Sequence, residues 1–375
     1  MTRWHLRTLI AAGLIAVATL AALAQQKAAP PPLDPLAPKT SAEGAAIAPL
    51  HTVTICTSDL QAYLHLYRDG LGMSVKGPVP LSARARAAVN TVWGMKSGER
   101  WTLYLLERPT VPDAARVRLL VFDSPGSAIR QTWDPREPAP FTLGFPTTAL
   151  PPLDASLRAL GFRSLAKMEQ SRIPRPDGTS YGMQEAVFKG PDHVHAVTVS
   201  RLDGMPQLGG VDPVTGLGGP AYSAQVVVDS AAVIAFYCDL LGLELRSDRE
   251  WKTGATSAIG LPEGTAFRFS LLYAPGAATG QLLIMDFRGL TAKPSGVAPR
   301  PPNRGLGMYT FPVRSLDATA AKLRAARAVI VAGPTALDSP DLGRHRVMTV
   351  LAPNGVLVEL FERAPGARPG NGGLR

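Results

Sequence analysis

The chain has 375 residues, of which 46% are hydrophobic and 18% are charged, a balance typical of globular domains with filled cores and not of disordered or fibrous proteins. At roughly 150 residues per domain, this length predicts about two domains. The formal net charge is +10, but the basic residues are scattered, with no dense run and no interleaved aromatic residues, so no nucleic-acid partner is expected.

Residues 1–24 have the three parts of a secretory signal peptide. Two arginines give a positive start, residues 9–23 are almost entirely apolar, and residues 22–24 form an A-x-A cleavage site. An uncleaved anchor is the alternative, but the apolar run is short for a bilayer span. We therefore predict a periplasmic or secreted protein with no membrane contact after cleavage. The Ala/Pro-rich residues 25–48 are expected to form a linker.

A strand–helix unit begins near residue 50. Residues 52–75 (TVTICTSDLQAYLHLYRDGLGMSV) open with a β-rich run and then place Asp59 where a helix N-cap is needed, because its carboxylate accepts from the first free N–H groups. Apolar residues at helical spacing continue to Gly72, where a left-handed residue ends a helix at low cost. A further strand is expected after it.

The same unit recurs 170 residues later. Residues 222–245 (YSAQVVVDSAAVIAFYCDLLGLEL) align with the first copy without a gap, and Asp229 and Gly242 stand at its cap positions. A weaker pair of segments, 142–162 and 308–328, aligns at a shift of 166. These repeats therefore predict four strand–helix–strands units and an α+β fold with mostly antiparallel strands.

The opening of these units resembles modules of the glyoxalase/bleomycin-resistance/extradiol-dioxygenase (vicinal oxygen chelate) superfamily. The shared pattern is a short strand, an Asp, a helix ending in an apolar residue and Tyr, and then Leu-Gly with Met or Leu, at 59–73 and at 229–243. Residues 353–360 (PNGVLVEL) are similar to that family's last strand. The resemblance covers about residues 49–363 and implies the fold rather than an activity, because this fold hosts many functions.

The resemblance implies two glyoxalase-like domains built from four βαβββ modules. Residues 49–202 would form the first domain and residues 220–363 the second, each a cupped, mostly antiparallel sheet with helices on its outer face. The Gly/Pro-rich residues 203–219 are expected to link them, and residues 364–375 to form a disordered tail. The two cysteines fall in regular elements of different domains, so two free, mostly buried thiols are expected rather than a disulfide.

In that superfamily a cup often holds a divalent metal, bound by a His or Gln in each first strand and a Glu in a last strand, which acts as a Lewis acid on vicinal oxygens or O₂. The resemblance puts poor ligands for a hard divalent ion at the four first-strand positions, which are Thr52, Thr142, Tyr222 and Met308. Glu359 alone matches a family ligand.

Three side chains are candidates for binding a divalent metal such as Fe, Mn, Ni or Zn, namely Glu359, His51 and His195. His51 comes one residue early, so strand alternation sends it to the helix-packed face unless a bulge intervenes. His195 lies two residues before the last-strand position of its module. Glu359 has apolar neighbours and needs a partner, which is either a metal or an arginine such as Arg344 or Arg346.

Two functions remain open. The first is a protein that binds a small organic molecule, with a degenerate metal site and with cup-lining residues that include Thr52, Thr54, Thr142, Tyr222 and Met308. The second is a divalent-metal-dependent lyase, isomerase or dioxygenase that uses Glu359, or His51 with His195. A structural or partner-binding module is a third reading, which requires both cups to be filled by side chains.

Overall fold

The computed structural model describes residues 38–175 and 177–363. The expected signal peptide, most of the Ala/Pro-rich linker and the C-terminal tail lie outside these residues. The described residues belong to one unit defined by chain contacts, Pro35–Arg375. None of the described helices is both long and apolar enough to cross a bilayer.

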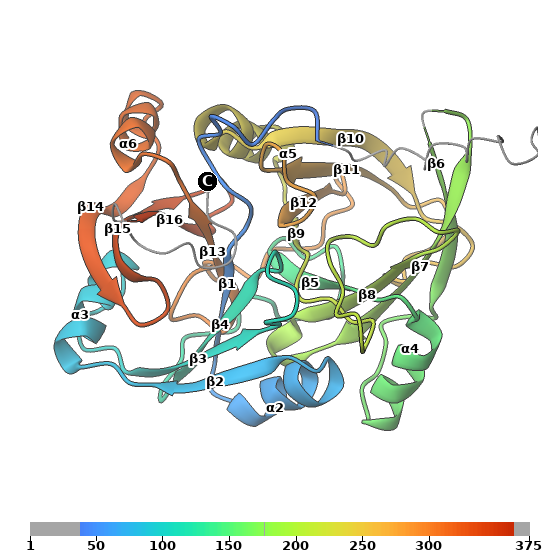
Figure 1. The fold of residues 1–375 in the computed structure, drawn as a ribbon, viewed down its shortest axis with the longest axis horizontal. Helices are drawn as coiled ribbons and strands as arrows, with labels where there is room; N and C mark the ends of the chain where they lie inside the picture. Colours follow the sequence, from blue (N-terminus) through green and yellow to red (C-terminus); the bar gives the residue numbers. More distant parts are fainter. Residues whose placement is uncertain (1–37, 176, 364–375) are drawn as a thin grey trace, which may run out of the picture. The chain divides into compact units, whose positions relative to one another are not determined.

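Four strand–helix–strands units follow one another along the chain, as expected (Figure 1). The first consists of β1 (Thr52–Thr57), α2 (Leu60–Leu64), the π-helical turn η1 (His65–Gly70), β2 (Ser74–Val79), an added helix α3 (Ala83–Val92), β3 (Trp101–Glu107) and β4 (Arg116–Phe122). The second consists of β5 (Pro140–Pro146), α4 (Leu150–Ala159), β6 (Glu169–Pro174), β7 (Ser180–Lys189), the 3₁₀ turn η2 (Pro191–His193) and β8 (His195–Arg201). The third consists of β9 (Tyr222–Val226), α5 (Ser230–Ala235), the π-helical turn η3 (Phe236–Leu241), β10 (Glu244–Lys252), β11 (Ala266–Tyr273) and β12 (Gln281–Asp286). The fourth consists of β13 (Gly305–Pro312), α6 (Leu316–Ala325), β14 (Ile330–Ser339), β15 (Gly343–Leu351) and β16 (Leu357–Arg363).

The stronger sequence repeat is reproduced in local structure. Asp59 accepts a hydrogen bond from the backbone N–H of Ala62 at 2.9 Å, and Asp229 accepts one from that of Ala232 at 3.0 Å. Both helices then widen into one π-helical turn. Gly242 ends the second with a φ of 95°, in the left-handed region that favours glycine. The two predicted N-caps are therefore confirmed.

The sixteen strands of the described residues form two eight-stranded sheets, and each sheet draws on both halves of the chain. The first unit joins the fourth in the order β14-β15-β16-β13-β1-β4-β3-β2, and the second joins the third in the order β10-β11-β12-β9-β5-β8-β7-β6. The seams are the antiparallel pairs β1–β13 and β5–β9. The resemblance implied one cup from residues 49–202, the first and second units, and another from residues 220–363, the third and fourth units. The sheets instead join the first unit to the fourth and the second to the third. The repeat in the sequence could not specify which strand edges pair, because all four units have equivalent edges.

The helix that follows the first strand of each unit packs on the outer face of its sheet, as expected for this fold class, whereas the added helix α3 packs on the cup face. Val53 and Ile55 of β1 belong to one large apolar cluster with Tyr63 and Tyr67 from the first helical segment. Cys56, one residue later than Ile55, belongs to a separate cluster on the opposite face. Strand alternation therefore divides each sheet into a helix-packed face and a cup face.

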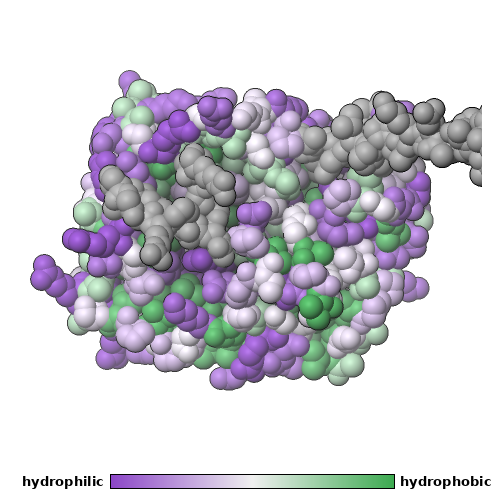
Figure 2. Space-filling view, viewed as in Figure 1, coloured by the Kyte–Doolittle hydropathy of each residue, from purple (hydrophilic) through white to green (hydrophobic). Residues whose placement is uncertain are grey.

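Both cysteines are free, and Cys56 is buried while Cys238 is half-buried, which confirms the expected thiols. Figure 2 shows that polar side chains cover most of the face in view, with apolar residues in small separate groups. Few large apolar side chains of the described residues are exposed, the most exposed being Val214. A mixed surface of this kind is ordinary for a globular domain.

Candidate functional site in the two cups

The cup of the sheet formed by β1–β4 and β13–β16, here cup A, is filled by side chains. Its apolar cluster combines Met308 and Leu357 from the sheet with Val92 and Trp93 at the end of α3. The hydroxyl of Thr349 on β15 donates a hydrogen bond to the Val92 carbonyl, which fixes the end of α3 to the sheet. The added helix therefore occupies the space that a ligand would take.

Glu359 is buried in cup A, and both of its carboxylate oxygens accept hydrogen bonds from the protein. Its carboxylate accepts from Trp93 Nε1 at 2.7 Å, from Thr310 Oγ1 at 2.8 Å and from Arg118 Nη1 at 2.9 Å. The side chain that balances its charge is thus Arg118 on β4. The expected partner was a metal or an arginine such as Arg344 or Arg346. The partner is an arginine, but it is neither of the two named, and Arg346 pairs with Asp317 and Glu362.

Arg118 is one of the largest fully buried side chains in the described chain. Its guanidinium also binds Asp341, with Nη2–Oδ2 and Nε–Oδ2 distances of 2.6 and 2.8 Å, and lies 5.0 Å from the Trp93 ring centroid. Burial alone would lower the pKa of Arg118, but the charges and hydrogen bonds of Asp341 and Glu359 raise it above its ordinary value. A fully paired ion triad therefore occupies the centre of cup A.

The strand registers identify the positions equivalent to Glu359 in the other units. Glu359 pairs with Thr310, two residues after the first-strand position of its unit. The corresponding partners in the first, second and third units are Arg118, Val197 and Leu283. With Thr, Thr, Tyr and Met at the first-strand positions, these superfamily ligand positions offer one carboxylate and no histidine in the two cups together. This donor set does not fit a divalent metal.

His51 and Thr52 lie at the start of β1. The imidazole Nδ1 is 2.8 Å from Thr52 Oγ1, and the ring meets Phe361 edge-on at a centroid distance of 5.2 Å. Thr54 lies further along β1, where its hydroxyl accepts from Arg118 at 3.3 Å. The candidates of the first unit are thus engaged by neighbouring side chains of the protein.

His195 is fully buried at the start of β8, in the sheet of the other cup. Its ring lies 5.4 Å from that of Trp133 and 5.7 Å from that of Phe141. Burial lowers the pKa of His195 to about 3, and the charge of Arg130 lowers it further, so the imidazole is neutral. Across residues 38–175 and 177–363, no group of three or more His, Cys, Asp or Glu side chains is placed to hold a metal ion.

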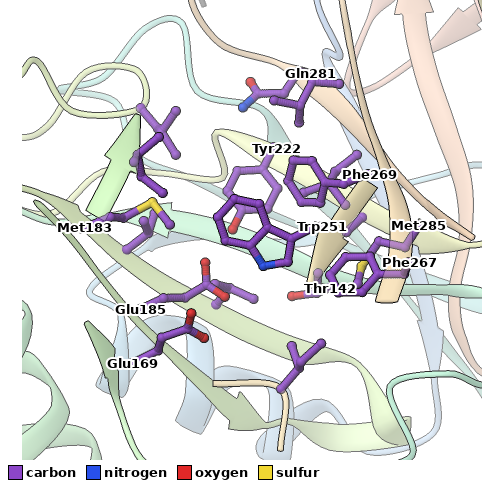
Figure 3. A pocket seen from close by; sticks show the side chains of 18 of the residues that line it. Thr142, Glu169, Met183, Glu185, Tyr222, Trp251, Phe267, Phe269, Gln281 and Met285 are labelled. Carbon is purple, nitrogen blue, oxygen red and sulfur yellow. The ribbon is translucent and has the colours of Figure 1, made fainter. Parts of the chain in front are cut away.

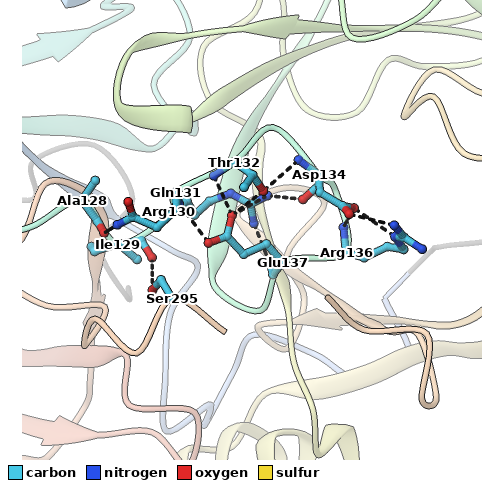
Figure 4. A network of polar contacts seen from close by, with 9 residues as sticks. All are labelled: Ala128, Ile129, Arg130, Gln131, Thr132, Asp134, Arg136, Glu137 and Ser295. Carbon is cyan, nitrogen blue, oxygen red and sulfur yellow. Dashed lines mark hydrogen bonds and ion pairs between the residues drawn. The ribbon is translucent and has the colours of Figure 1, made fainter. Parts of the chain in front are cut away.

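The loop between β4 and β5, which carries Trp133, is fixed by hydrogen bonds around the buried Glu137 (Figure 4). The Glu137 carboxylate accepts from two consecutive backbone N–H groups at 2.9 and 3.0 Å and from the Thr132 hydroxyl at 2.9 Å. Arg130 Nη1 donates to the Glu137 carbonyl at 2.6 Å. This network fixes the loop that carries Trp133, whose ring packs against His195. His195 therefore belongs to a buried aromatic cluster.

The cup of the sheet formed by β5–β12, here cup B, contains a partly open cavity of about 160 Å³. Its wall is mostly aromatic and apolar, with contributions from every strand of the sheet (Figure 3). Alternate residues of β7 reach it, in order Tyr181, Met183 and Glu185, as expected for the cup face of a strand. Of the residues predicted to line a cup, Thr142 and Tyr222 lie in this wall, whereas Met308 is core in cup A.

Gly144 makes room for the ring of Tyr222. The two residues are register partners across the β5–β9 seam. A Cβ atom at residue 144 would lie 2.0 Å from the Tyr222 ring, far inside any permitted contact. The absent side chain at this position therefore lets the tyrosine lie across the floor of cup B.

Glu169 and Glu185 are the acidic groups of the cavity wall, and they are direct cross-strand partners on β6 and β7. Glu169 Oε2 accepts from the Ala258 N–H at 2.8 Å. Burial raises the pKa of Glu185 to about 7, with a further contribution from the charge of Glu169, and burial also raises the pKa of Glu169. The sequence analysis did not identify this pair, because no motif marks it.

Arg249 and Trp251 on β10 line the cavity with the same strand parity. The guanidinium carbon of Arg249 lies 4.9 Å from the Trp251 ring centroid, and its Nε donates no hydrogen bond within the described residues. Burial lowers the pKa of Arg249, partly opposed by Tyr181. Cup B thus combines an apolar cavity with polar groups whose hydrogen-bonding capacity is not used up by the protein, which is the usual composition of a small-molecule site.

Residues 219–360 match the family described as Glyoxalase/Bleomycin resistance protein/Dioxygenase superfamily. This match spans the third and fourth units, and therefore one half of each sheet. No curated protein matches the sequence closely enough to count as a relative.

Several solved structures share the fold at low sequence identity. A point mutant of glyoxalase I from Zea mays has a TM-score of 0.55 and 15% identity, covering 86% of this chain and 95% of its own. Another crystal structure of Zea mays glyoxalase I has a TM-score of 0.53 at 15% identity, with 86% and 94% covered. A putative dioxygenase from Bacillus subtilis has a TM-score of 0.50 at 13% identity, with 86% and 87% covered. At these identities the similarity establishes the fold alone.

Proposed function

Because the chain carries a domain of the glyoxalase/bleomycin resistance protein/dioxygenase superfamily, we propose that it binds a small organic molecule in cup B and that the superfamily's metal site is degenerate in both cups. The observation that carries this proposal is the contrast between the cups: cup B contains a cavity of about 160 Å³, whereas cup A is filled by α3 and an ion triad.

The size of the cavity limits the ligand. An apolar cavity of about 150 Å³ is large enough to hold benzene, so cup B has room for a molecule of about one substituted ring. The wall includes large aromatic side chains that bury apolar area at low entropic cost, among them Tyr222, Trp251 and Phe269. The ligand we expect is therefore compact and largely apolar.

The proposal of a degenerate metal site rests on the donor set. Glu359 is the one carboxylate at the superfamily's ligand positions, and it is already neutralised by Arg118 at 2.9 Å. At the other last-strand positions cup B has Val197 and Leu283, which have no donor atoms in their side chains.

A panel of single-ring molecules tests the binding proposal. Ligands that enter cup B should raise the melting temperature of the protein, because they bind only the folded state. Gly144→Val, which reduces the space beside Tyr222, should abolish these shifts, whereas Thr54→Val, the matched substitution in cup A, should retain them. If no neutral, cationic or anionic member of the panel shifts the melting temperature, the binding proposal fails.

Metal analysis tests the second half of the proposal. The purified protein, supplemented in turn with Fe, Mn, Ni and Zn salts and then dialysed, should retain no stoichiometric metal. If one equivalent is retained and Glu359→Gln removes it, the site is not degenerate, and the metal-dependent lyase, isomerase or dioxygenase is the better interpretation.

We also propose that the protein is exported, on the basis of the signal pattern in residues 1–24. The mature protein should begin at Gln25, which N-terminal sequencing of material from the periplasm or the medium would reveal. Recovery of the uncleaved chain in the cytoplasm would contradict this.

A further inference from the structure

Glu169 and Glu185 form an acidic pair that the protein itself leaves without a counter-charge. Two carboxylates directly opposite each other on antiparallel strands repel, and both line a cavity with an apolar wall, where an uncompensated charge is costly. Neither carboxylate forms an ion pair within the described residues, and no cationic group lowers the pKa of either. Such an arrangement requires a proton or a cation from outside the protein.

The other charged and titratable groups of the cavity do not neutralise the pair. Arg249 lies over the Trp251 ring, and the guanidinium carbon of Arg201 lies 5.6 Å from the Tyr181 ring centroid. The remaining titratable groups are three phenols, those of Tyr181, Tyr222 and Tyr273. Burial and the charge of Glu185 raise the pKa of Tyr222, so this phenol is neutral.

The indole of Trp251 lies beside the acidic pair. In Figure 3, Glu169 and Glu185 lie side by side, with their carboxylates turned toward the ring of Trp251. An organic cation is attracted to the face of an aromatic ring by about 0.5–2 kcal/mol, most strongly by tryptophan. An anion beside the pair would be repelled by both carboxylates, and the two arginines of the same wall, Arg201 and Arg249, already lie over aromatic rings. The cavity therefore combines acidic groups and an aromatic face, the two features that recognise an organic cation.

We propose that cup B binds an organic ammonium ion, with its amine between the carboxylates of Glu169 and Glu185 and its body, about one ring in size, against Trp251. This inference rests on the proposed function, because it names the ligand class of the same cavity. No step of covalent chemistry is involved. The cation supplies the counter-charge that the acidic pair lacks.

Binding of this ligand should depend on pH. Glu185 has a pKa near 7, so a cation that binds its carboxylate form must displace a proton at neutral pH. The affinity for the amine should therefore rise about tenfold from pH 6 to pH 8 and level off above it, until the amine loses its own proton near pH 10. Of the other charged and titratable groups of the cavity, Glu169 adds negative charge, the Tyr222 phenol is neutral, and Arg201 and Arg249 add positive charge, so none of them reverses this direction.

Three probes of matched size test the inference by isothermal titration calorimetry. They are 2-phenylethylammonium, 3-phenylpropionate and ethylbenzene. The ammonium ion should bind at least tenfold more tightly than ethylbenzene, and the carboxylate should not bind. If the carboxylate or the hydrocarbon binds as tightly as the amine, the inference is overturned, while the proposal of a small-molecule site stands.

Two isosteric variants decide which carboxylates matter. Glu185→Gln should weaken binding of the ammonium ion at least tenfold at pH 8, remove its pH dependence and leave ethylbenzene binding unchanged. The control is Glu250→Gln, which removes an exposed carboxylate from β10 that pairs with Arg288. If Glu185→Gln unfolds the protein, Glu169→Gln provides the same test. Unchanged amine affinity in a folded variant of either glutamate would contradict the inference.

Discussion

Cup A and cup B are made from the same repeated unit, but they differ at the positions where strand side chains meet at the centre of the sheet. In cup A, Arg118 bridges Glu359 and Asp341 beneath a helix that no other unit has. In cup B, the positions equivalent to Arg118 and Glu359 are Val197 and Leu283. The acidic pair of cup B lies instead on the outer strands β6 and β7, and a cavity-lining arginine lies on the edge strand β10.

The comparison indicates that two cups of the same fold can take different roles, one stabilising the protein and the other binding a ligand. Cup A satisfies each of its buried charges internally, so it gains order and loses a ligand site. Cup B leaves Glu185 without an ion pair and the Nε of Arg249 without a hydrogen bond within the described residues, a costly arrangement that a ligand can relieve. The following predictions test whether the two cups have these separate roles.

The largest effect is expected from breaking the ion triad of cup A. Arg118→Ala leaves Glu359 and Asp341 buried without a cation, and removing one partner of a buried pair costs about 3–5 kcal/mol. Urea denaturation at neutral pH should register this as a lower midpoint at an unchanged slope. Arg249→Ala in cup B is the matched control and should cost far less, because Arg249 has no ion pair within the described chain. Equal losses for the two arginines would remove the distinction between the cups.

The second effect is a pH dependence contributed by cup B. The pKa of Glu185 is raised from its ordinary value of 4.5 to about 7, so between these values the folded state binds more protons than the unfolded state. Stability should therefore fall as pH rises from about 4.5 to 7, by an amount on the order of 2–3 kcal/mol. Glu185→Gln should remove this decline, measured as unfolding free energy against pH. A decline that persists in the variant would place the titrating group elsewhere.

Only part of the structure behind these two effects could be predicted from the sequence. The repeat at a shift of 170 predicted the helix caps at Asp59 and Asp229, and strand alternation predicted the cup face of β1, because both depend on neighbours in the sequence. The pairing of the first unit with the fourth depends on contacts between distant edges, so it could not be predicted. The same holds for the choice of Arg118 as the partner of Glu359, 241 residues away.

The acidic pair was missed for a related reason. Glu169 and Glu185 become partners only when the register of the β6–β7 hairpin is known. A one-residue slip would send both carboxylates to the opposite face. The available signal was the alternation of Tyr181, Met183 and Glu185, in which a single acidic residue interrupts an apolar face. Such an interruption is informative only once that face is known to line a cavity.

The smallest effect concerns the space beside Tyr222. Gly144→Ala adds a Cβ where the ring already lies, so the tyrosine must shift into the cavity. Overpacking of this kind costs about 1–3 kcal/mol. The displaced ring should also reduce the affinity for ligands of cup B without changing cup A. Gly98→Ala serves as the control, because its Cβ would meet nothing within 4 Å. Thermal unfolding with and without a bound ligand measures both consequences. If Gly144→Ala lowers stability but leaves ligand affinity unchanged, Tyr222 is a packing residue of the seam, and the ligand lies against the Trp251 side of the cavity.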